Sequence, residues 1–192
     1  AVDKPAGMSF HSDDLVYNSP GVLTTVRKLQ ASGKLEGSDY TGPLHSVHRL
    51  DKVTSGVLLF AKSEAAAAAL SAQFQRRAVH KYYVALSARK PSKKMGTVSG
   101  DMAKARRGAY KLTRGGGGGG KGGDSAVTRF VSRGVTGAAV DLKPNSNSTS
   151  TLAGAAARTR APPTSRPLRL LLMKPLTGKT HQLRVACKSL GA

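Results

Sequence analysis

The chain has 192 residues, of which 31 are Lys or Arg and 10 are Asp or Glu, so its formal net charge is +21. Such an excess of positive charge indicates a polyanionic partner. The single cysteine, Cys187, excludes an internal disulfide and a paired-cysteine zinc ribbon, and it favours a reducing intracellular compartment. The apolar runs are much shorter than the about 20 residues that cross a bilayer, so we expect no membrane span.

The two ends of the sequence read as an excerpt. The chain opens at Ala1 without an initiator methionine, and neither a signal peptide nor an arginine-rich presequence is recognisable. A chain of this length can bury roughly 70% of its unfolded surface in one core. We therefore expect a single domain over residues 1–192. Removal of a targeting peptide and further residues beyond the two ends are both left open.

Helices are predicted in two places near the start of the chain. Apolar residues recur at helical spacing within residues 20–32, at Val22, Leu23, Val26 and Leu29. The alanine-rich stretch from Glu64 to Arg77 follows Ser63, a favourable N-cap, and ends in two arginines that suit a helix C-terminus. Apolar and aromatic runs at residues 57–60, 80–88, 126–132 and 168–173 favour strands, so a mixed α and β fold is expected.

Two segments interrupt this pattern. Residues 115–123 are glycine apart from Lys121, and residues from about 134 to 167 are rich in Ser, Thr, Ala and Pro. Such composition buries too little apolar area to offset about 1 to 2 kcal/mol of backbone ordering entropy per residue. Both are expected to be flexible surface insertions, with an RNA-contacting role and a plain linker role left open.

Chemistry is concentrated at residues 48–56, H-R-L-D-K-V-T-S-G, directly before an apolar run. Arg49 and Lys52 flank Asp51, and nearby cations favour the charged form of a carboxylate, which makes it a competent nucleophile or base. The same triplet would also suit an ordinary surface ion pair. His48 is expected to hold the loop through hydrogen bonds.

A second polar stretch, L-T-G-K-T-H-Q-L-R-V at residues 176–185, precedes a predicted helix with Thr180 as its N-cap. Its Gly-Lys-Thr resembles the end of a P-loop, but that motif needs a glycine where Met173 stands. The glycine run does not match a P-loop either, because Gly122 stands where the motif requires Ser or Thr. A P-loop nucleotide site is therefore excluded.

Taken together, these motifs resemble the RNA pseudouridine synthases of the RluA type. The matches are D-K-P-A-G-M at residues 3–8 with His11, the H-R-L-D-x-x-T-S-G motif at 48–56, K-x-Y at 81–83 and G-K-T-H-Q-L-R-V at 178–185. They occur in the family's order. The resemblance implies an α+β catalytic fold with a mixed, mainly antiparallel sheet flanked by helices.

The resemblance also implies roles for individual residues. Asp51 is the catalytic aspartate, with attack at the sugar C1′ and at the base C6 both open, and Arg184 pairs with its carboxylate. Leu183 lines the uracil pocket, and Arg49 occupies the space left by a flipped nucleotide. Tyr83 packs against the target base.

Alternation along a strand lets only one of two adjacent tyrosines face the site, so Tyr82 is expected in the core. Isomerisation needs no redox change and no external group, so neither a cofactor nor a metal is expected. RNA binding relies on phosphate neutralisation, and a basic stripe is predicted near the cleft, from Lys81, Arg76, Arg77, Arg106, Arg107, Lys104 and Lys111.

The favoured function is isomerisation of uridine to pseudouridine in structured RNA. The expected substrate is ribosomal RNA within a pre-ribosomal particle, with ribosomal or assembly proteins as further partners. The alternative is an RNA-binding ribosome-assembly factor that keeps the fold with catalysis secondary or lost. A structural ribosomal protein would explain the charge but not the motifs. The biased composition leans toward a eukaryotic protein of a mitochondrial ribosome, with cytoplasm and nucleus as alternatives.

Overall fold

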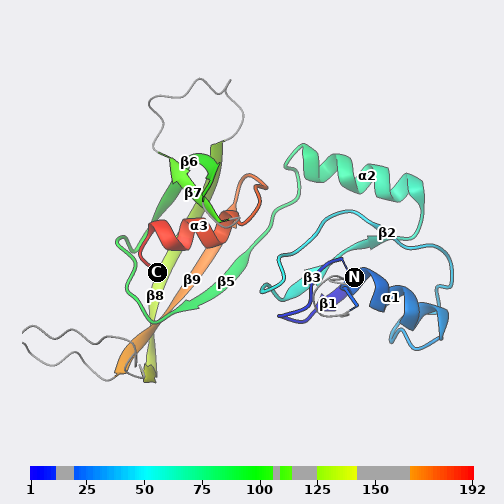
Figure 1. Ribbon diagram of the computed structural model, residues 1–192, viewed down its shortest axis with the longest axis horizontal. Helices are drawn as coiled ribbons and strands as arrows, with labels where there is room; N and C mark the ends of the chain where they lie inside the picture. Colours follow the sequence, from blue (N-terminus) through cyan, green and yellow to red (C-terminus); the bar gives the residue numbers. More distant parts are fainter. Residues whose placement is uncertain (12–19, 106–108, 114–124, 142–164) are drawn as a thin grey trace, which may run out of the picture. The chain divides into compact units, whose positions relative to one another are not determined.

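The protein folds into two compact units, Ala1–Val79 and His80–Ala192, in this computed structural model (Figure 1). Each unit is described by itself, and the single domain expected over residues 1–192 stays a prediction. The described helices are too short or too polar to cross a membrane. The structure describes residues 1–11, 20–105, 109–113, 125–141 and 165–192.

The first unit combines two helices with two small antiparallel ladders. Strand β1 pairs with β3, with Lys4 opposite Gly56, and β2 pairs with β4, with His45 opposite Ala61. The predicted apolar strand at residues 57–60 is divided at Leu59, because its two halves pair with different partners. The elements are β1 (Val2–Lys4), α1 (Val22–Ala31), β2 (His45–Ser46), β3 (Gly56–Leu58), β4 (Phe60–Ala61) and α2 (Glu64–Gln75).

Both predicted helices form, and their ends follow local physical rules. Helix α1 buries Val22 and Val26, which lie one turn apart on one face. The Ser63 hydroxyl caps α2 by accepting a hydrogen bond from the Ala66 amide at 3.2 Å, as predicted. Helix α2 ends at Gln75, and Arg77 takes a left-handed conformation with φ 60.

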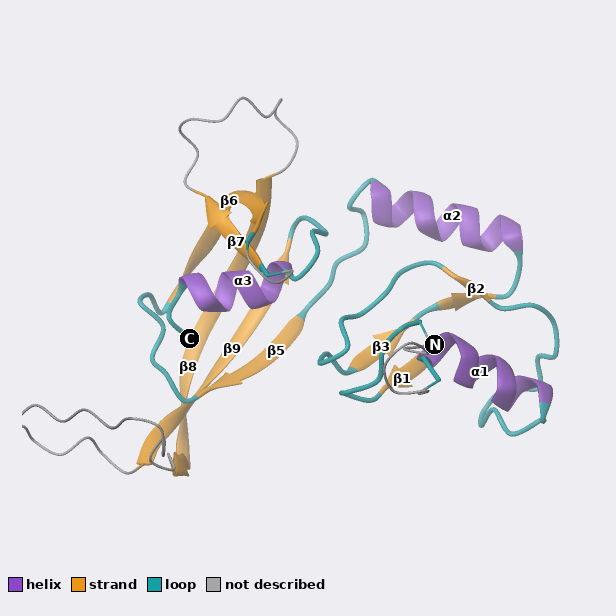
Figure 2. Ribbon diagram, viewed as in Figure 1, coloured by secondary structure: helices purple, strands orange, loops and turns teal. Residues whose placement is uncertain are grey.

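The second unit is a five-stranded antiparallel sheet in the order β5-β9-β8-β6-β7, with α3 against it (Figure 2). The α+β class with a mainly antiparallel sheet is therefore confirmed. The core between helix and sheet is formed by Phe130, Leu171, Met173 and Leu190. The elements are β5 (Tyr83–Ser87), β6 (Met95–Lys104), β7 (Tyr110–Thr113), β8 (Ser125–Asp141), β9 (Ser165–Pro175) and α3 (Gln182–Ser189).

The strands β8 and β9 are longer than the sequence predicts. Their pairing extends to Asp141 opposite Ser165, with an irregularity between Gly134 and Ala139, so the ladder enters the expected insertion at 134–167 from both sides. Backbone hydrogen bonding to a neighbouring strand orders residues whose composition alone is unfavourable. The expected insertion at 115–123 lies outside the described residues, as do residues 142–164.

The sheet is buried on only one face, and this overturns the expected burial of Tyr82. Tyr82 is 60% exposed and lies just before β5, with the Lys174 ammonium 5.2 Å from its ring centroid. On the same strand, Val84 is 66% exposed, whereas Tyr83 packs against the core. Alternation along the strand is as predicted, but the face opposite the core is open to solvent in this unit.

Candidate active site

Asp51 lies in a tight turn of the first unit, directly after the buried Leu50. The turn is closed by a hydrogen bond from the Thr54 amide to the Asp51 carbonyl, at 3.0 Å. Asp51 itself is half-buried, and its neighbour Arg49 is exposed. A buried leucine on one side and a closed turn on the other therefore fix the backbone that carries the acidic side chain.

The side chain of Lys4 supports this turn from inside the first unit. Lys4 is 0% exposed, and its ammonium donates to three backbone carbonyls: Pro5 at 2.9 Å, Lys52 at 3.2 Å and Thr54 at 2.7 Å. The Gly7 amide adds a 2.8 Å hydrogen bond to the Lys52 carbonyl. The segment that follows β1 and the Asp51 turn are thus joined at several points.

Lys4 also acts on the electrostatics of the turn. Burial lowers the pKa of Lys4, because a charged ammonium is costly away from water, and the charge of Asp51 opposes this by raising the pKa. The two groups therefore interact as opposite charges inside one unit.

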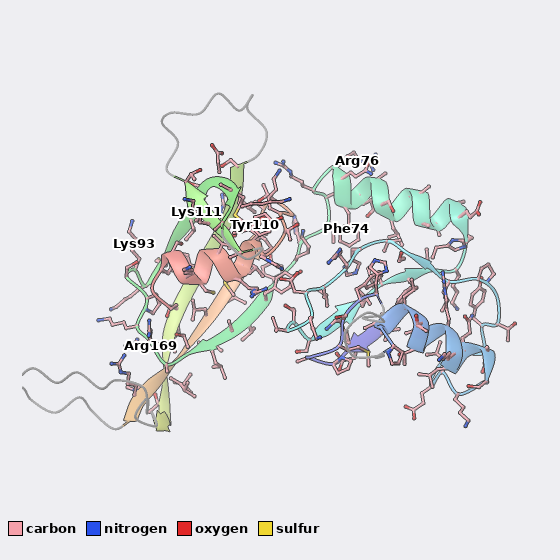
Figure 3. The ribbon with its side chains drawn as sticks, viewed as in Figure 1. Phe74, Arg76, Lys93, Tyr110, Lys111 and Arg169 are labelled. Atoms are coloured by element: carbon pink, nitrogen blue, oxygen red, sulfur yellow. The ribbon has the colours of Figure 1, made fainter. Side chains whose placement is uncertain are left out.

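His48 holds the same loop from another side, as the sequence predicted. Its Nε2 accepts a hydrogen bond from the Leu59 amide at 3.0 Å, so the proton of the neutral ring lies on Nδ1. The ring stacks on Phe74 of α2, with centroids 4.8 Å apart and an interplanar angle of 23°. Figure 3 shows Phe74 near the end of α2. His48 is therefore a scaffold residue that connects the loop with the helix.

In the second unit, the structure brings together two of the predicted base-contacting residues. Tyr83 begins β5 and Leu183 lies in the first turn of α3, and both pack half-buried against the same core cluster. Arg184, the next helix residue, is exposed. Because Asp51 and Arg184 belong to different units, their pairing stays a prediction.

The turn before α3 differs from the sequence prediction. Thr180 is not its N-cap; His181 takes this position in a left-handed conformation with φ 57 and no side-chain capping bond. Instead, the buried side chain of Gln182 bonds both the turn and strand β8. Long-range hydrogen bonds replace the local cap in this turn.

The predicted basic residues fall into two groups. Lys81 is half-buried, its ammonium lies 3.7 Å from where a Cβ on Gly178 would stand, and burial lowers its pKa. The others that the structure describes are exposed, and their contact with RNA stays a prediction: Arg76, Arg77, Lys104 and Lys111. Figure 3 labels Arg76, directly after the end of α2, and Lys111 on β7. Arg106 and Arg107 lie outside the described residues.

Sequence reasoning assigned no role to Lys4, Thr177 or Gln182, although all three lie in or beside the matched motifs. Each is a polar residue that the fold buries completely or nearly so. Their position inside motifs rich in other polar groups was the only available signal. As for metal ligands, no three His, Cys, Asp or Glu side chains gather anywhere in the described part of the chain.

The fold and these motifs define a class of RNA-modifying protein. The family model described as RNA pseudouridylate synthase matches residues 1–189, so the chain belongs to this family, and the resemblance to the RluA type is confirmed.

Individual relatives agree with the family assignment. An uncharacterized RNA pseudouridine synthase of Haemophilus influenzae is 38% identical over 185 residues, which cover 95% of this chain and 67% of the relative. Ribosomal large subunit pseudouridine synthase C of Rickettsia bellii is 29% identical, over 100% of this chain and 50% of its own length. The solved structure of human RNA pseudouridylate synthase domain containing 4 has a TM-score of 0.61 at 22% identity, and the match covers 97% of this chain and 59% of that one. The chain thus spans about half to two thirds of the length of these proteins.

Proposed function

We propose that this chain carries the catalytic core of an enzyme that isomerises uridine to pseudouridine in RNA, with Asp51 as the attacking carboxylate. The observation that carries the proposal is the Asp51 turn, in which a half-buried aspartate sits on a backbone that is hydrogen-bonded to the fully buried Lys4, in a member of this family. An oriented, ionised carboxylate is what nucleophilic catalysis requires.

The chemistry is a rearrangement within one nucleotide. The N1–C1′ bond breaks, a C5–C1′ bond forms, the C5 proton leaves to solvent, and N1 gains a proton. Asp51 attacks C1′ or C6 and leaves again, so it is regenerated. Arg184 holds the carboxylate ionised and oriented, and Tyr83 stacks on the base while Leu183 lines its apolar side. Arg49 fills the gap that the extruded nucleotide leaves.

Ribosomal RNA is the substrate that we propose. The Rickettsia bellii relative is named for the ribosomal large subunit, and the net charge of +21 suits a large folded RNA. A pre-ribosomal particle would then be the setting in which the protein meets its substrate. The proposal is tested against two alternatives. In the first, transfer RNA is the substrate; in the second, the protein has a purely structural role in assembly.

The test uses ribosomal RNA and transfer RNA transcribed with uridine labelled with tritium at C5, because isomerisation releases that tritium. We expect release from the ribosomal transcript, and a loss of at least about a thousandfold in Asp51→Asn, which removes the nucleophile. The matched control Asp39→Asn makes the same charge change at an exposed site of the same unit and should release tritium normally. Equal activity of Asp51→Asn and the control would overturn the proposal. Tritium release from the transfer RNA alone would mean that transfer RNA, rather than ribosomal RNA, is the substrate.

A further inference from the structure

Gln182, the first residue of α3, uses every hydrogen bond that its side chain can make. Its Oε1 accepts from the Thr177 hydroxyl at 2.8 Å and from the Lys179 amide at 3.0 Å. Its Nε2 donates to the Val127 carbonyl and to the Thr128 hydroxyl, both at 3.0 Å. A glutamine amide offers two acceptor and two donor sites, so this group is fully satisfied. Only 6% of the residue is exposed.

These bonds connect the turn before α3 with strand β8. The β8–β9 ladder ends where Thr128 faces Pro175. Beyond it, the Val127 amide donates to the Thr177 hydroxyl at 2.9 Å, and the Val127 carbonyl accepts from the Leu176 amide at 2.8 Å. The side chains of Thr177 and Gln182 therefore extend the hydrogen bonding of the sheet into the turn that leads to the helix.

The helix needs this support because its own start is poorly stabilised. His181 occupies the N-cap in a left-handed conformation that costs energy for a residue with a Cβ. Its ring meets the edge of the Tyr110 ring, with centroids 5.5 Å apart at 87°. The helix contacts β7 and β8, and its first residue is bonded to β8 in place of a local side-chain cap.

We infer that Gln182 is the positioning residue of the α3 side of the active site: its four hydrogen bonds fix the first helical turn and so the directions of Leu183 and Arg184. The inference rests on the proposed function for its catalytic consequence. The side chain touches neither base nor sugar. Its effect follows from geometry, because a misplacement of about 1 Å can cost about a hundredfold in rate.

The test replaces Gln182 with methionine, which keeps the length and apolar volume but makes none of the four bonds. We expect the single-turnover rate of tritium release to fall about ten- to a hundredfold, while the Kd for the RNA transcript changes less than about threefold. The matched control Gln73→Met makes the same substitution at an exposed position of α2, and it should keep the rate within about twofold. Both variants are measured at a temperature where each is folded by circular dichroism.

Two further measurements make the outcome decisive. Thr177→Val should lower the rate in the same sense, and the double variant should be no slower than Gln182→Met, because both changes break one network. Amide exchange of Lys179, whose acceptor is the Gln182 side chain, should accelerate at least about tenfold in Gln182→Met but not in Gln73→Met. Independent, multiplying rate losses would overturn the inference, as would an unchanged rate.

The exchange experiment also separates this inference from the proposed function. If the unmodified protein releases no tritium, the proposed function fails, and the exchange rate of Lys179 still decides whether Gln182 orders the turn. Unchanged exchange in Gln182→Met overturns the inference whatever the activity. Faster exchange with an unchanged reaction rate in an active enzyme also overturns it.

Discussion

The turn of Asp51 in the first unit and the turn before α3 in the second are each held by one buried polar side chain, but the two anchors differ in charge. Lys4 is a cation that donates to three carbonyls, whereas Gln182 is neutral and both donates and accepts. A neutral amide fixes geometry at little electrostatic cost. A buried ammonium fixes geometry and also supplies a positive potential, at the expense of its own solvation.

This difference suits what each turn presents. The first turn carries Asp51, and the positive charge of Lys4 interacts favourably with the charge of Asp51. The second turn leads into α3, whose first turn carries Arg184, and a buried cation there would oppose the positive guanidinium. A neutral anchor avoids that repulsion. The type of anchor therefore matches the charge of the residue that it positions.

The largest expected effect comes from removing the charged anchor. Lys4→Ala removes a charged donor from three backbone carbonyls and opens a cavity, so we expect the free energy of unfolding to fall by about 3 to 5 kcal/mol. Lys4→Met keeps most of the volume and relieves the ammonium of its burial, and should cost about 1 to 3 kcal/mol. Urea unfolding followed by circular dichroism measures both. If Lys4→Ala were as stable as the unmodified protein, the anchoring role of Lys4 would be excluded.

A second prediction concerns the residue at the other turn. Arg184→Met should lower the single-turnover rate about a hundredfold, because under the proposed function the Asp51 carboxylate loses its partner, while RNA affinity falls less than about threefold. Lys188→Met is the matched control, since it removes an exposed positive charge from the same helix. It should keep the rate. Equal losses of rate and affinity in Arg184→Met would contradict its pairing with Asp51.

A smaller effect should appear in the pH dependence of stability. The pKa of Lys4 is lowered in the folded state from its ordinary value of 10.5, so between the two values the unfolded chain binds more protons. Stability should therefore rise with pH in that window, by at most about 1.4 kcal/mol per pH unit, relative to Lys4→Met. Asp51→Asn removes the opposing charge and should widen the window. Parallel pH profiles of the unmodified protein and Lys4→Met would refute this.

The smallest effect distinguishes Arg77 from His181, which are the non-glycine residues with positive φ in the described part of the chain. Among the described residues, His181 has an aromatic contact, with Tyr110, and Arg77 has none. Arg77→Gly should stabilise the protein by about 0.5 to 1 kcal/mol, because glycine adopts this conformation without strain. His181→Gly should be about neutral, since the relief of strain is offset by the lost contact. Thermal unfolding detects the difference, and equal gains at both sites would mean that the Tyr110 contact contributes nothing.

The amino-acid sequence alone determined the helices α1 and α2, the apolar strands and the family. Those features depend on short-range patterns: the spacing of Val22 and Val26, the Ser63 cap, and motifs such as that of residues 48–56. The expected role of His48 as a loop anchor followed from the same local pattern. Physical rules that act within a few residues can be read without coordinates.

Only the tertiary structure decided the rest. Which of the two tyrosines, Tyr82 or Tyr83, meets the core depends on the sheet face against which α3 packs. The first turn of α3 is bonded to β8 through Gln182 and has no cap from Thr180. The anchoring roles of Lys4 and Gln182 arise from long-range contacts. Lys4 bonds a residue 48 positions away in the chain, and Gln182 bonds one 54 positions away. Burial and hydrogen-bond satisfaction are properties of the folded chain, because they arise between residues that no local pattern connects.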